Sequence, residues 1–344
     1  MENHSVSDRK ITDHRENRMK HKGLFKGAVV SALLAGSAIS AQAQEGWPSD
    51  IKIGTASQGG TYAIIGSGIA SLVSDEVGVG AAAEITGGPV QNVTMVETGD
   101  HQIGLVTLGP AKAAWDGKSL LAPGMTHEQL RALFPMYVTP FQVITLNDSG
   151  ITSLEDLDGK RINFGPATGT GGTYWPQILD TLGISYDERF SGGADAAGQL
   201  TDGLVDAIAF AGGVPIPFFS QLTVEADVTM FGLTEEERDT VMTAMPVFAP
   251  FNIEAGTYTG HDYDQETVGM WNFGIASSDM PEDLAYEITR TVLENNEYMM
   301  QVHSVTKDMV ADNWTANTVI PFHPGAARYL REAGAEIPDE MIAQ

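Results

Sequence analysis

Two loops rich in glycine, serine and threonine are the segments of this chain whose residues could do chemistry. They are Gly54–Thr61, GTASQGGT, and Gly165–Thr173, GPATGTGGT. Each follows an apolar run that predicts a strand and precedes a pattern that predicts a helix. The first N–H groups of a helix lack partners within it and carry partial positive charge, glycine lets a ligand approach the backbone, and hydroxyls add donors. One such loop could be an ordinary capped turn, but two of one design predict a site for a carboxylate or phosphate.

The sequence lacks the residue patterns of nucleotide-binding, hydrolase and metal sites. The chain contains no G-x-x-x-x-G-K-[ST], G-x-S-x-G or H-E-x-x-H motif, and Gly169-Thr170-Gly171 has Tyr174 where a dinucleotide fingerprint needs its third glycine. There is no cysteine and the histidines are scattered; Asp262 and Asp264 flank Tyr263 and could bind calcium, but without a spaced set of ligands solvated carboxylates are the better interpretation. We therefore predict no catalytic residue, no metal and no cofactor. An enzyme stays open as the rival class, because triads can assemble from distant residues.

The elements that must position the two loops alternate between strand and helix, in the order βαβ, which predicts an α/β fold. In the first unit we expect strands at 51–54, 81–85 and 102–108, a helix whose apolar face runs from Ile65 to Val73, and a helix at 90–98. A second unit with the same alternation begins after Tyr137, with strands at 141–146, 160–164 and 204–210 and a helix at 173–182. After an irregular stretch from Pro246 to Glu266 come a strand at 267–277, a long helix after Asp279 and a last helix after His323.

This order predicts two lobes, because the chain must return to the first unit for its last helices. We expect residues 44–137 and 270–344 to form lobe 1, and residues 138–269 to form lobe 2, inserted in lobe 1. The predicted crossings lie near residues 136–140 and 266–269.

Residues 1–43 are predicted to be an N-terminal extension and a secretory signal peptide. A basic stretch around Met19 precedes the small apolar run Gly27–Ile39, and Ala41-Gln42-Ala43 supplies an A-x-A site, so we expect cleavage after Ala43. A membrane anchor is the alternative, but the apolar run is short for a bilayer span. Because residues 1–18 are polar and charged, Met19 is a second candidate for the start of translation.

The charge balance excludes nucleic acid as a partner. The whole chain has a formal net charge of −26, and residues 44–344 contain 12 basic and 41 acidic side chains, a net charge of −29. Nucleic-acid binding needs a basic face. We attribute the acidic balance to solubility of an exported protein, with an acidic docking patch as the alternative.

Four stretches in order resemble the TAXI family, the solute-binding subunits of one branch of the TRAP transporters. They are Ile53–Gly66, Thr86–Val106, Phe164–Ile184 and Pro321–Gly334, and together they span the chain from about Ile51 to Gly334. They match that family's first Gly-Thr loop, its Gly-Gly turn and following helix, its second Gly-Thr helix start and its C-terminal His-Pro-Gly-Ala helix. Pro89 departs from the pattern, because the family often has serine there, and Ala209–Phe219 is more apolar than usual.

The resemblance implies a type II-like, two-lobe periplasmic binding protein fold with the ligand cleft between the lobes. It implies a periplasmic monomer that captures a small organic acid, either a dicarboxylate or an acidic amino acid such as glutamate, and delivers it to the membrane subunits of a sodium-coupled TRAP transporter. In the first lobe it implies ligand contacts from Ser57, Gly60, Thr61, Tyr62, Gly88, Asn92 and Thr107. In the second lobe it implies contacts from Thr168, Gly169, Thr170, Phe210 and Gly212. His323 is expected to dock the last helix. A binding protein of an ABC importer, a solute sensor docking to a membrane receptor and a periplasmic hydrolase are the alternatives.

Overall fold

The structure is a computed structural model that describes residues 46–342. The predicted signal peptide, its cleavage after Ala43 and the choice between Met1 and Met19 fall outside the described residues. Within residues 46–342, no helix is long and apolar enough to cross a membrane.

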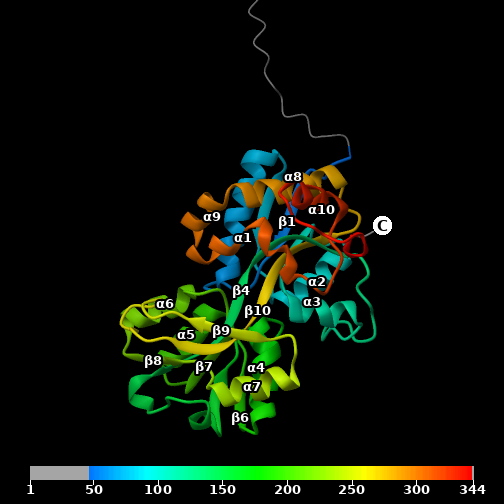
Figure 1. The fold of residues 1–344 in the computed structure, drawn as a ribbon. Coiled ribbons are helices and arrows are strands. Elements are labelled where there is room, and N and C mark those ends of the chain that lie inside the picture. The colour runs from blue at the N-terminus through cyan, green and yellow to red at the C-terminus, as the bar shows by residue number, and fades with distance from the viewer. Residues whose placement is uncertain (1–45, 343–344) are drawn as a thin grey trace, which may run out of the picture. The chain divides into compact units, whose positions relative to one another are not determined.

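The first lobe is built on the parallel strands β1, β2 and β3, in the order β2-β1-β3, with β10 (Gln265–Ser277) antiparallel to β3 (Figure 1). We use the name first lobe for β1–β3, α1–α3 and α8–α10. Their bounds are β1 (Asp50–Gly54), α1 (Thr61–Leu72), β2 (Gly80–Glu84), α2 (Pro89–Glu97), β3 (Ile103–Thr107), α3 (Leu108–Trp115), α8 (Glu282–Glu294), α9 (Asn296–Val302) and α10 (Pro324–Glu332).

The second lobe comprises β5–β8 and α4–α7. Here β5 lies parallel to β6 and β7, while β7 and β8 pair antiparallel with β4 (Leu130–Leu146). The bounds are β5 (Lys160–Asn163), α4 (Thr170–Leu182), β6 (Tyr186–Arg189), α5 (Gly193–Thr201), β7 (Ala207–Ala211), α6 (Pro217–Glu225), β8 (Val228–Phe231) and α7 (Glu235–Ala244).

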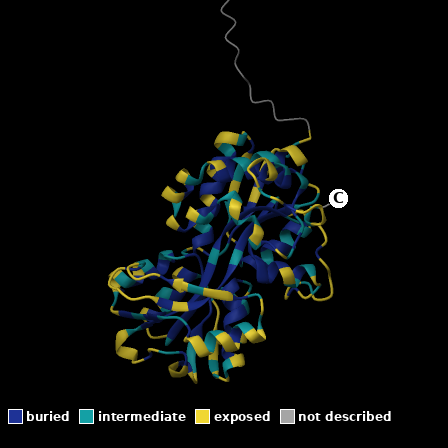
Figure 2. Cartoon of the chain, in the orientation of Figure 1, coloured by how far each residue is buried: buried dark blue, intermediate teal, exposed yellow. Residues whose placement is uncertain are grey.

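Two long strands run through both lobes: β4 (Leu130–Leu146) and β10 (Gln265–Ser277). They pair antiparallel from Leu130 opposite Ser277 to Pro140 opposite Gly269, and β9 (Ala249–Ile253) joins the outer edge of β10. Both strands are buried along most of their length (Figure 2). The sequence predicted only residues 141–146 of β4, because a run that is apolar on both faces has no alternating pattern to extend it.

The hydrophobic core is divided in the same way as the sheet. One cluster contains buried residues from Ile51 to Tyr137 and from Phe273 to Ile337, and two others lie between Phe141 and Met270. The predicted lobe boundaries, 137/138 and 269/270, fall where β4 and β10 pair. The exact boundaries stay a prediction.

Local signals explain where several helices begin. Thr234 and Glu237 form a reciprocal capping box at α7, and His323 caps α10 by accepting a hydrogen bond from the Gly325 N–H at 3.2 Å. His323 also donates from Nε2 to the Met280 carbonyl, so it fixes α10 against the start of α8, as expected. The sequence did not predict β6, β8, β9, α3, α5, α6, α7 and α9. β9 lies within the stretch expected to be irregular.

Candidate functional site

The first glycine-rich loop ends at the N-terminus of α1. Gly60 is the N-cap residue and supplies no side-chain oxygen, and the first turn has no acidic side chain. Gly59 adopts a φ of +84°, a left-handed conformation that glycine takes without strain. The first N–H groups of α1 and the helix dipole are therefore available to an anion.

The second loop repeats this arrangement at α4. Gly169 is the N-cap residue, again without a side-chain cap, and Thr170 begins the helix. The Asn163 side chain at the end of β5 orients the loop by accepting a hydrogen bond from the Gly165 N–H at 2.8 Å. The two predicted loops thus have one local geometry, in one lobe each.

The two loops meet at one cavity of about 40 Å³, which we call the interlobe cavity. Its wall combines glycines, hydroxyls, prolines and aromatic rings from both lobes and from β4. The lining residues are Ala56, Ser57, Gly60, Thr61, Tyr62, Pro89, Thr139, Phe164, Pro166, Gly169, Thr170, Gly171, Phe210, Ala211 and Gly212. A cavity needs about 10–15 Å³ to hold one water molecule, so this one takes a small solute only.

Eight of the twelve residues implied by the family resemblance line this cavity. They are Ser57, Gly60, Thr61, Tyr62, Gly169, Thr170, Phe210 and Gly212. Three others lie at its edge. Thr107 reaches the hydroxyl of Thr170 at 3.0 Å, Thr168 donates to the Gly87 carbonyl at 3.0 Å, and Gly88 lies against Gly169, whose Cα is 2.9 Å from where a Cβ on Gly88 would stand.

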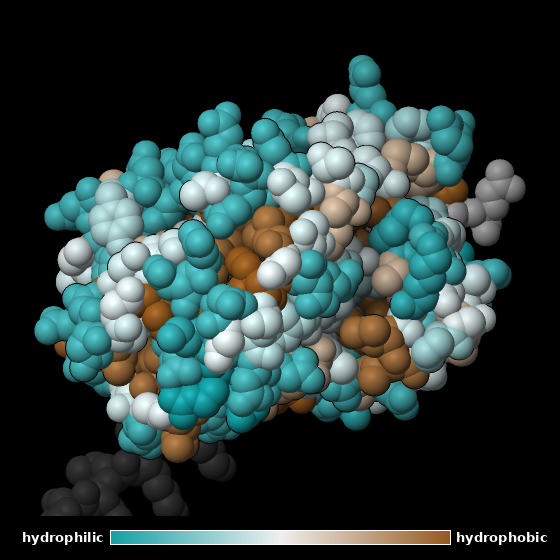
Figure 3. Space-filling view, turned by 90° about the horizontal axis from the view of Figure 1, so that it is seen from below, coloured by the Kyte–Doolittle hydropathy of each residue, from teal (hydrophilic) through white to brown (hydrophobic). Residues whose placement is uncertain are grey.

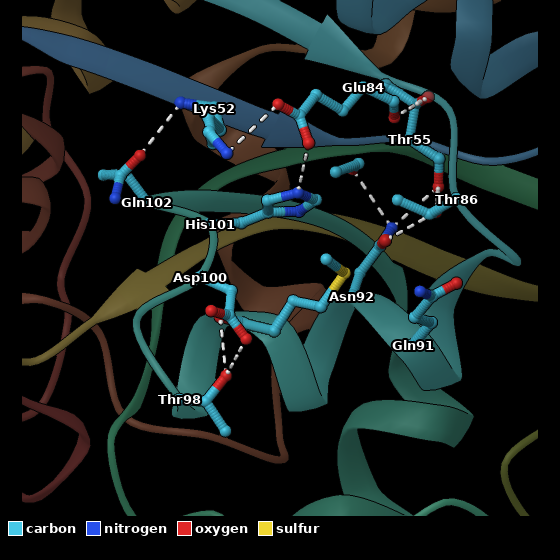
Figure 4. Close-up of polar contacts among 12 residues, drawn as sticks. Lys52, Thr55, Glu84, Thr86, Gln91, Asn92, Thr98, Asp100, His101 and Gln102 are labelled. Carbon is cyan, nitrogen blue, oxygen red and sulfur yellow. Dashed lines mark hydrogen bonds and ion pairs between the residues drawn. The ribbon is translucent and has the colours of Figure 1, made fainter.

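Asn92 is outside the cavity and supports the first loop instead. Its amide nitrogen donates to the carbonyls of Gly54, Thr55 and Leu105 at 3.0, 2.7 and 2.8 Å. Its oxygen accepts from Thr86 Oγ1 at 2.7 Å (Figure 4). The side chain is fully buried, so Asn92 joins the ends of β1 and β3 below the loop.

A neighbouring polar group involves His101, whose Nε2 lies 2.9 Å from Glu84 Oε2, and Lys52, 3.4 Å from the other Glu84 oxygen (Figure 4). These bonds, with that of His101 first, hold the pKa of Glu84 below its usual range. The group lies beside Asn92 and is not part of the cavity wall.

Tyr62 connects the cavity to the two shared strands. Its hydroxyl donates to the Asn272 side chain on β10, which in turn donates to the Tyr137 carbonyl at 2.6 Å and to Thr139 Oγ1 at 2.8 Å on β4. Burial raises the pKa of Tyr62 well above its usual value, with a smaller contribution from Tyr137, so the phenol stays neutral.

The sequence analysis missed seven lining residues: Ala56, Pro89, Thr139, Phe164, Pro166, Gly171 and Ala211. Six of them adjoin residues that were predicted or lie in the same loops, so the motifs already indicated their place. Thr139 belongs to the predicted crossing near residues 136–140, but the sequence did not signal that it would line the cavity.

Hydrogen bonds between the lobes surround the cavity, and we call them the closure contacts. Side chains make five: Thr61 to Gly213 O (2.6 Å), Thr107 to Thr170 (3.0 Å), Thr168 to Gly87 O (3.0 Å), Gly193 N to Ser57 Oγ (3.3 Å) and His303 Nε2 to Pro215 O (3.0 Å). Backbone groups make three: Val90 N to Thr168 O (3.2 Å), Ala194 N to Gln58 O (3.4 Å) and Phe218 N to Gly59 O (3.3 Å). The lobes are therefore closed.

Catalytic and metal-binding chemistry would need residues of other types. Within the described part of the chain, no group of three or more His, Cys, Asp or Glu side chains could hold a metal ion. The cavity wall itself contains hydroxyls but no histidine, carboxylate or lysine that could activate one. The arrangement can bind a small solute through N–H and O–H donors.

Two connected lobes with a cavity between them are the architecture of two-lobe binding proteins. Comparisons with solved structures show the same fold. MatC from Rhodopseudomonas palustris, whose structure has bound malate, superimposes with a TM-score of 0.55 at 14% identity, over 83% of this chain and 99% of that one. The periplasmic binding protein BugD gives a TM-score of 0.51 at 14% identity, over 84% of this chain and 99% of that one. The chain has the two-lobe fold of periplasmic binding proteins. Residues 53–334 match the NMT1-like family model, and the chain belongs to that family.

Proposed function

We propose that this chain is the solute-binding subunit of a TRAP transporter of the TAXI branch, and that it captures a small organic acid. The observation that carries the proposal is the convergence of two glycine-capped helix N-termini, α1 and α4, on one interlobe cavity. Thr61 and Thr170 begin these helices; the Thr61 hydroxyl donates to Gly213 O, while the Thr170 hydroxyl can accept from Thr107 and donate beside the N–H groups of α4. A carboxylate can accept from such donors without a basic partner.

The proposed ligand contacts are the residues that line the cavity. The N–H groups that begin α1 and α4 and the Thr170 hydroxyl would hold carboxylate oxygens, and Phe210 would cover the remainder of the solute. The Tyr62 hydroxyl donates to Asn272, so it would accept from the solute. Thr107, Thr168 and Gly88 would act by closing the lobes, and Asn92 by fixing the loop that carries Ser57. We propose no reaction at this site, so the chain would release its solute unchanged.

The proposal also includes export and partners. The mature chain would begin after Ala43, reside in the periplasm as a monomer and dock to the membrane subunits of the transporter. Lobe 1 (residues 44–137 and 270–344) and lobe 2 (residues 138–269) would separate by bending β4 and β10 where they pair.

Ligand binding can be tested on residues 44–344 after unfolding and refolding to remove bound solute. Thermal unfolding is measured with dicarboxylates, malate among them, with glutamate, monocarboxylates, sugars and phosphate esters. A solute at 100 times its Kd stabilises the protein by about 2.7 kcal/mol, which gives a clear rise in Tm. We expect an organic acid to do so. Stabilisation by sugars or phosphate esters alone would contradict the proposal.

A pair of variants on α4 tests where the acid binds. Thr170→Val removes a hydroxyl from the cavity wall, whereas Thr181→Val makes the same change on the exposed face of that helix. We expect Thr170→Val to weaken binding about tenfold and Thr181→Val to leave it unchanged. Equal effects of the two changes would place the ligand elsewhere.

The transporter class is tested by uptake into vesicles that contain the membrane subunits encoded beside this gene. A TRAP transporter needs a sodium gradient, while an ABC importer needs ATP. Uptake that depends on ATP would support the ABC alternative. A neighbouring histidine kinase, with no transport subunits, would support the sensor.

A further inference from the structure

The wall of the interlobe cavity carries no charged side chain. Of its polar side chains, four are hydroxyls of serine or threonine and one is the phenol of Tyr62; the remaining lining residues are Gly, Ala, Pro and Phe. The surface is different, because most of the face shown in Figure 3 is hydrophilic. A solute that enters this cavity leaves a polar exterior for a wall of neutral dipoles and apolar surface.

The arginines of residues 46–342 bond to other groups and do not line this cavity. All seven arginines in the described residues bond to carboxylates or to backbone carbonyls. The pairs include Arg161 with Asp206 at 2.6 Å and Arg238 with Glu266 at 2.6 Å. An arginine could reach a second carboxylate of the ligand only by breaking such a bond.

An ammonium group on the ligand would also lack a partner in this cavity. A buried ammonium needs a carboxylate or several free carbonyls, and the wall contains no carboxylate. The carbonyls nearest the helix starts already accept closure contacts: Gly213 O from Thr61, Gly87 O from Thr168, and Thr168 O from Val90. A zwitterionic amino acid would therefore bury its positive charge without partners.

The apolar part of the wall indicates what the rest of the solute is. Phe164, Phe210, Pro89 and Pro166 face the cavity beside the hydroxyls, and Phe210 is held by an edge-to-face contact with Phe218 at 5.0 Å. Rings and prolines offer contact area but few hydrogen bonds. They suit a short carbon chain better than a second ionised group.

We infer that the ligand is a small monocarboxylate that carries no second charge. This inference rests on the proposed function and narrows it, since that proposal admits dicarboxylates and glutamate. Hydroxyl and oxo groups on the carbon chain are allowed, because Ser57 Oγ accepts from Gly193 N and keeps its proton for the solute, while the Tyr62 oxygen can accept from a solute hydroxyl.

The test uses refolded protein and pairs of acids that differ by one charged group. Butyrate is compared with succinate, and lactate with alanine, by calorimetry at one pH and ionic strength. We expect the singly charged member to bind at least roughly 100-fold more tightly, because a buried charge without a partner costs several kcal/mol. Tighter binding of succinate, alanine or glutamate overturns the inference but leaves the organic-acid proposal standing. If carboxylates do not bind and sugars or phosphate esters do, both fail.

A designed charge gives a second measurement. Ala56→Lys adds a cation to the cavity wall, and Ala63→Lys adds the same charge to α1 outside the wall. We expect Ala56→Lys to improve the affinity for succinate relative to butyrate by about tenfold or more, and Ala63→Lys to leave that ratio as it is. If Ala56→Lys folds but leaves the ratio of succinate to butyrate affinity unchanged, the lack of charge in the wall is not what determines the selectivity.

Discussion

The hydroxyl oxygens of Thr107 and Thr170 lie 3.0 Å apart, although Thr107 ends β3 in the first lobe and Thr170 begins α4 in the second. Both residues are buried. When Thr170 donates its proton to a ligand carboxylate, Thr107 can donate to Thr170 in turn. The pair therefore links ligand binding to closure through one shared hydrogen bond.

Thr107→Val is expected to weaken ligand binding by about fivefold to tenfold, because one lost hydrogen bond of this kind costs about 1 kcal/mol. Thr107→Ser keeps the hydroxyl and is the control, with an affinity close to that of the wild type. Calorimetry with the tightest acid of the panel measures both. Equal losses in the two variants would mean that affinity responds to any change of shape at this position, and not specifically to the loss of the hydroxyl.

Gly109→Ala is expected to hinder closure while leaving α3 intact. A Cβ on Gly109 would stand 2.3 Å from the Tyr174 hydroxyl of the second lobe, so the closed lobes have no room for it. Alanine itself favours the helix by about 1 kcal/mol over glycine.

The matched control for closure is Gly198→Ala in α5, where an added Cβ meets no atom within 4 Å. Because the chain has no cysteine, Ser67→Cys in α1 and Gln221→Cys in α6 allow specific fluorescent labelling of each lobe. Energy transfer should fall in Gly109→Ala and not in Gly198→Ala. High transfer in both would show that the Tyr174 contact yields without opening the lobes.

Asn92→Leu is expected to lower the free energy of unfolding by about 2–4 kcal/mol, since three buried carbonyls lose their donor at once. Thr94→Ala, on a more exposed face of the same helix, should cost far less. Urea unfolding measures both. A variant with unchanged stability but weaker ligand binding would restore Asn92 as a ligand contact.

His323 makes stability depend on pH. Burial lowers its pKa from 6.5 to about 4, while the unfolded chain keeps the ordinary value. Between these values the unfolded state binds the extra proton, so the free energy of unfolding falls with falling pH by up to about 1.4 kcal/mol per unit. His323→Asn keeps a capping oxygen for the Gly325 N–H and should reduce the slope between pH 6.5 and 4. An unchanged slope would assign this pH dependence to other groups.

Local signals in the sequence predicted where α1, α4 and α10 begin to within about three residues, although several other helices were missed. The Gly-Thr loops before Thr61 and Thr170 and the His-Pro-Gly at residues 323–325 each determine a helix N-terminus by their own backbone and capping chemistry. Such features need no knowledge of distant contacts. The same loops therefore also indicated most of the cavity wall.

Contacts between residues far apart in the sequence could not be predicted from such local signals. Asn92 and Tyr62 are both polar residues on an otherwise apolar helix face, and nothing in their spacing tells that one bonds to carbonyls below a loop while the other lines a cavity. The length of β4 was hidden because Leu130–Leu146 is buried on both sides. Both facts depend on tertiary packing.

The closure contacts have a kinetic consequence. All eight join one protein group to another, and seven of them lie next to the cavity, so the closed lobes keep the donors at the helix starts behind them. A solute can then reach its donors only during transient opening. The observed rate of association should rise with solute concentration at first and level off at the rate at which the lobes part. At low solute concentration, uptake would then be limited by the affinity of the protein. At high concentration, it would be limited by the rate at which the lobes open.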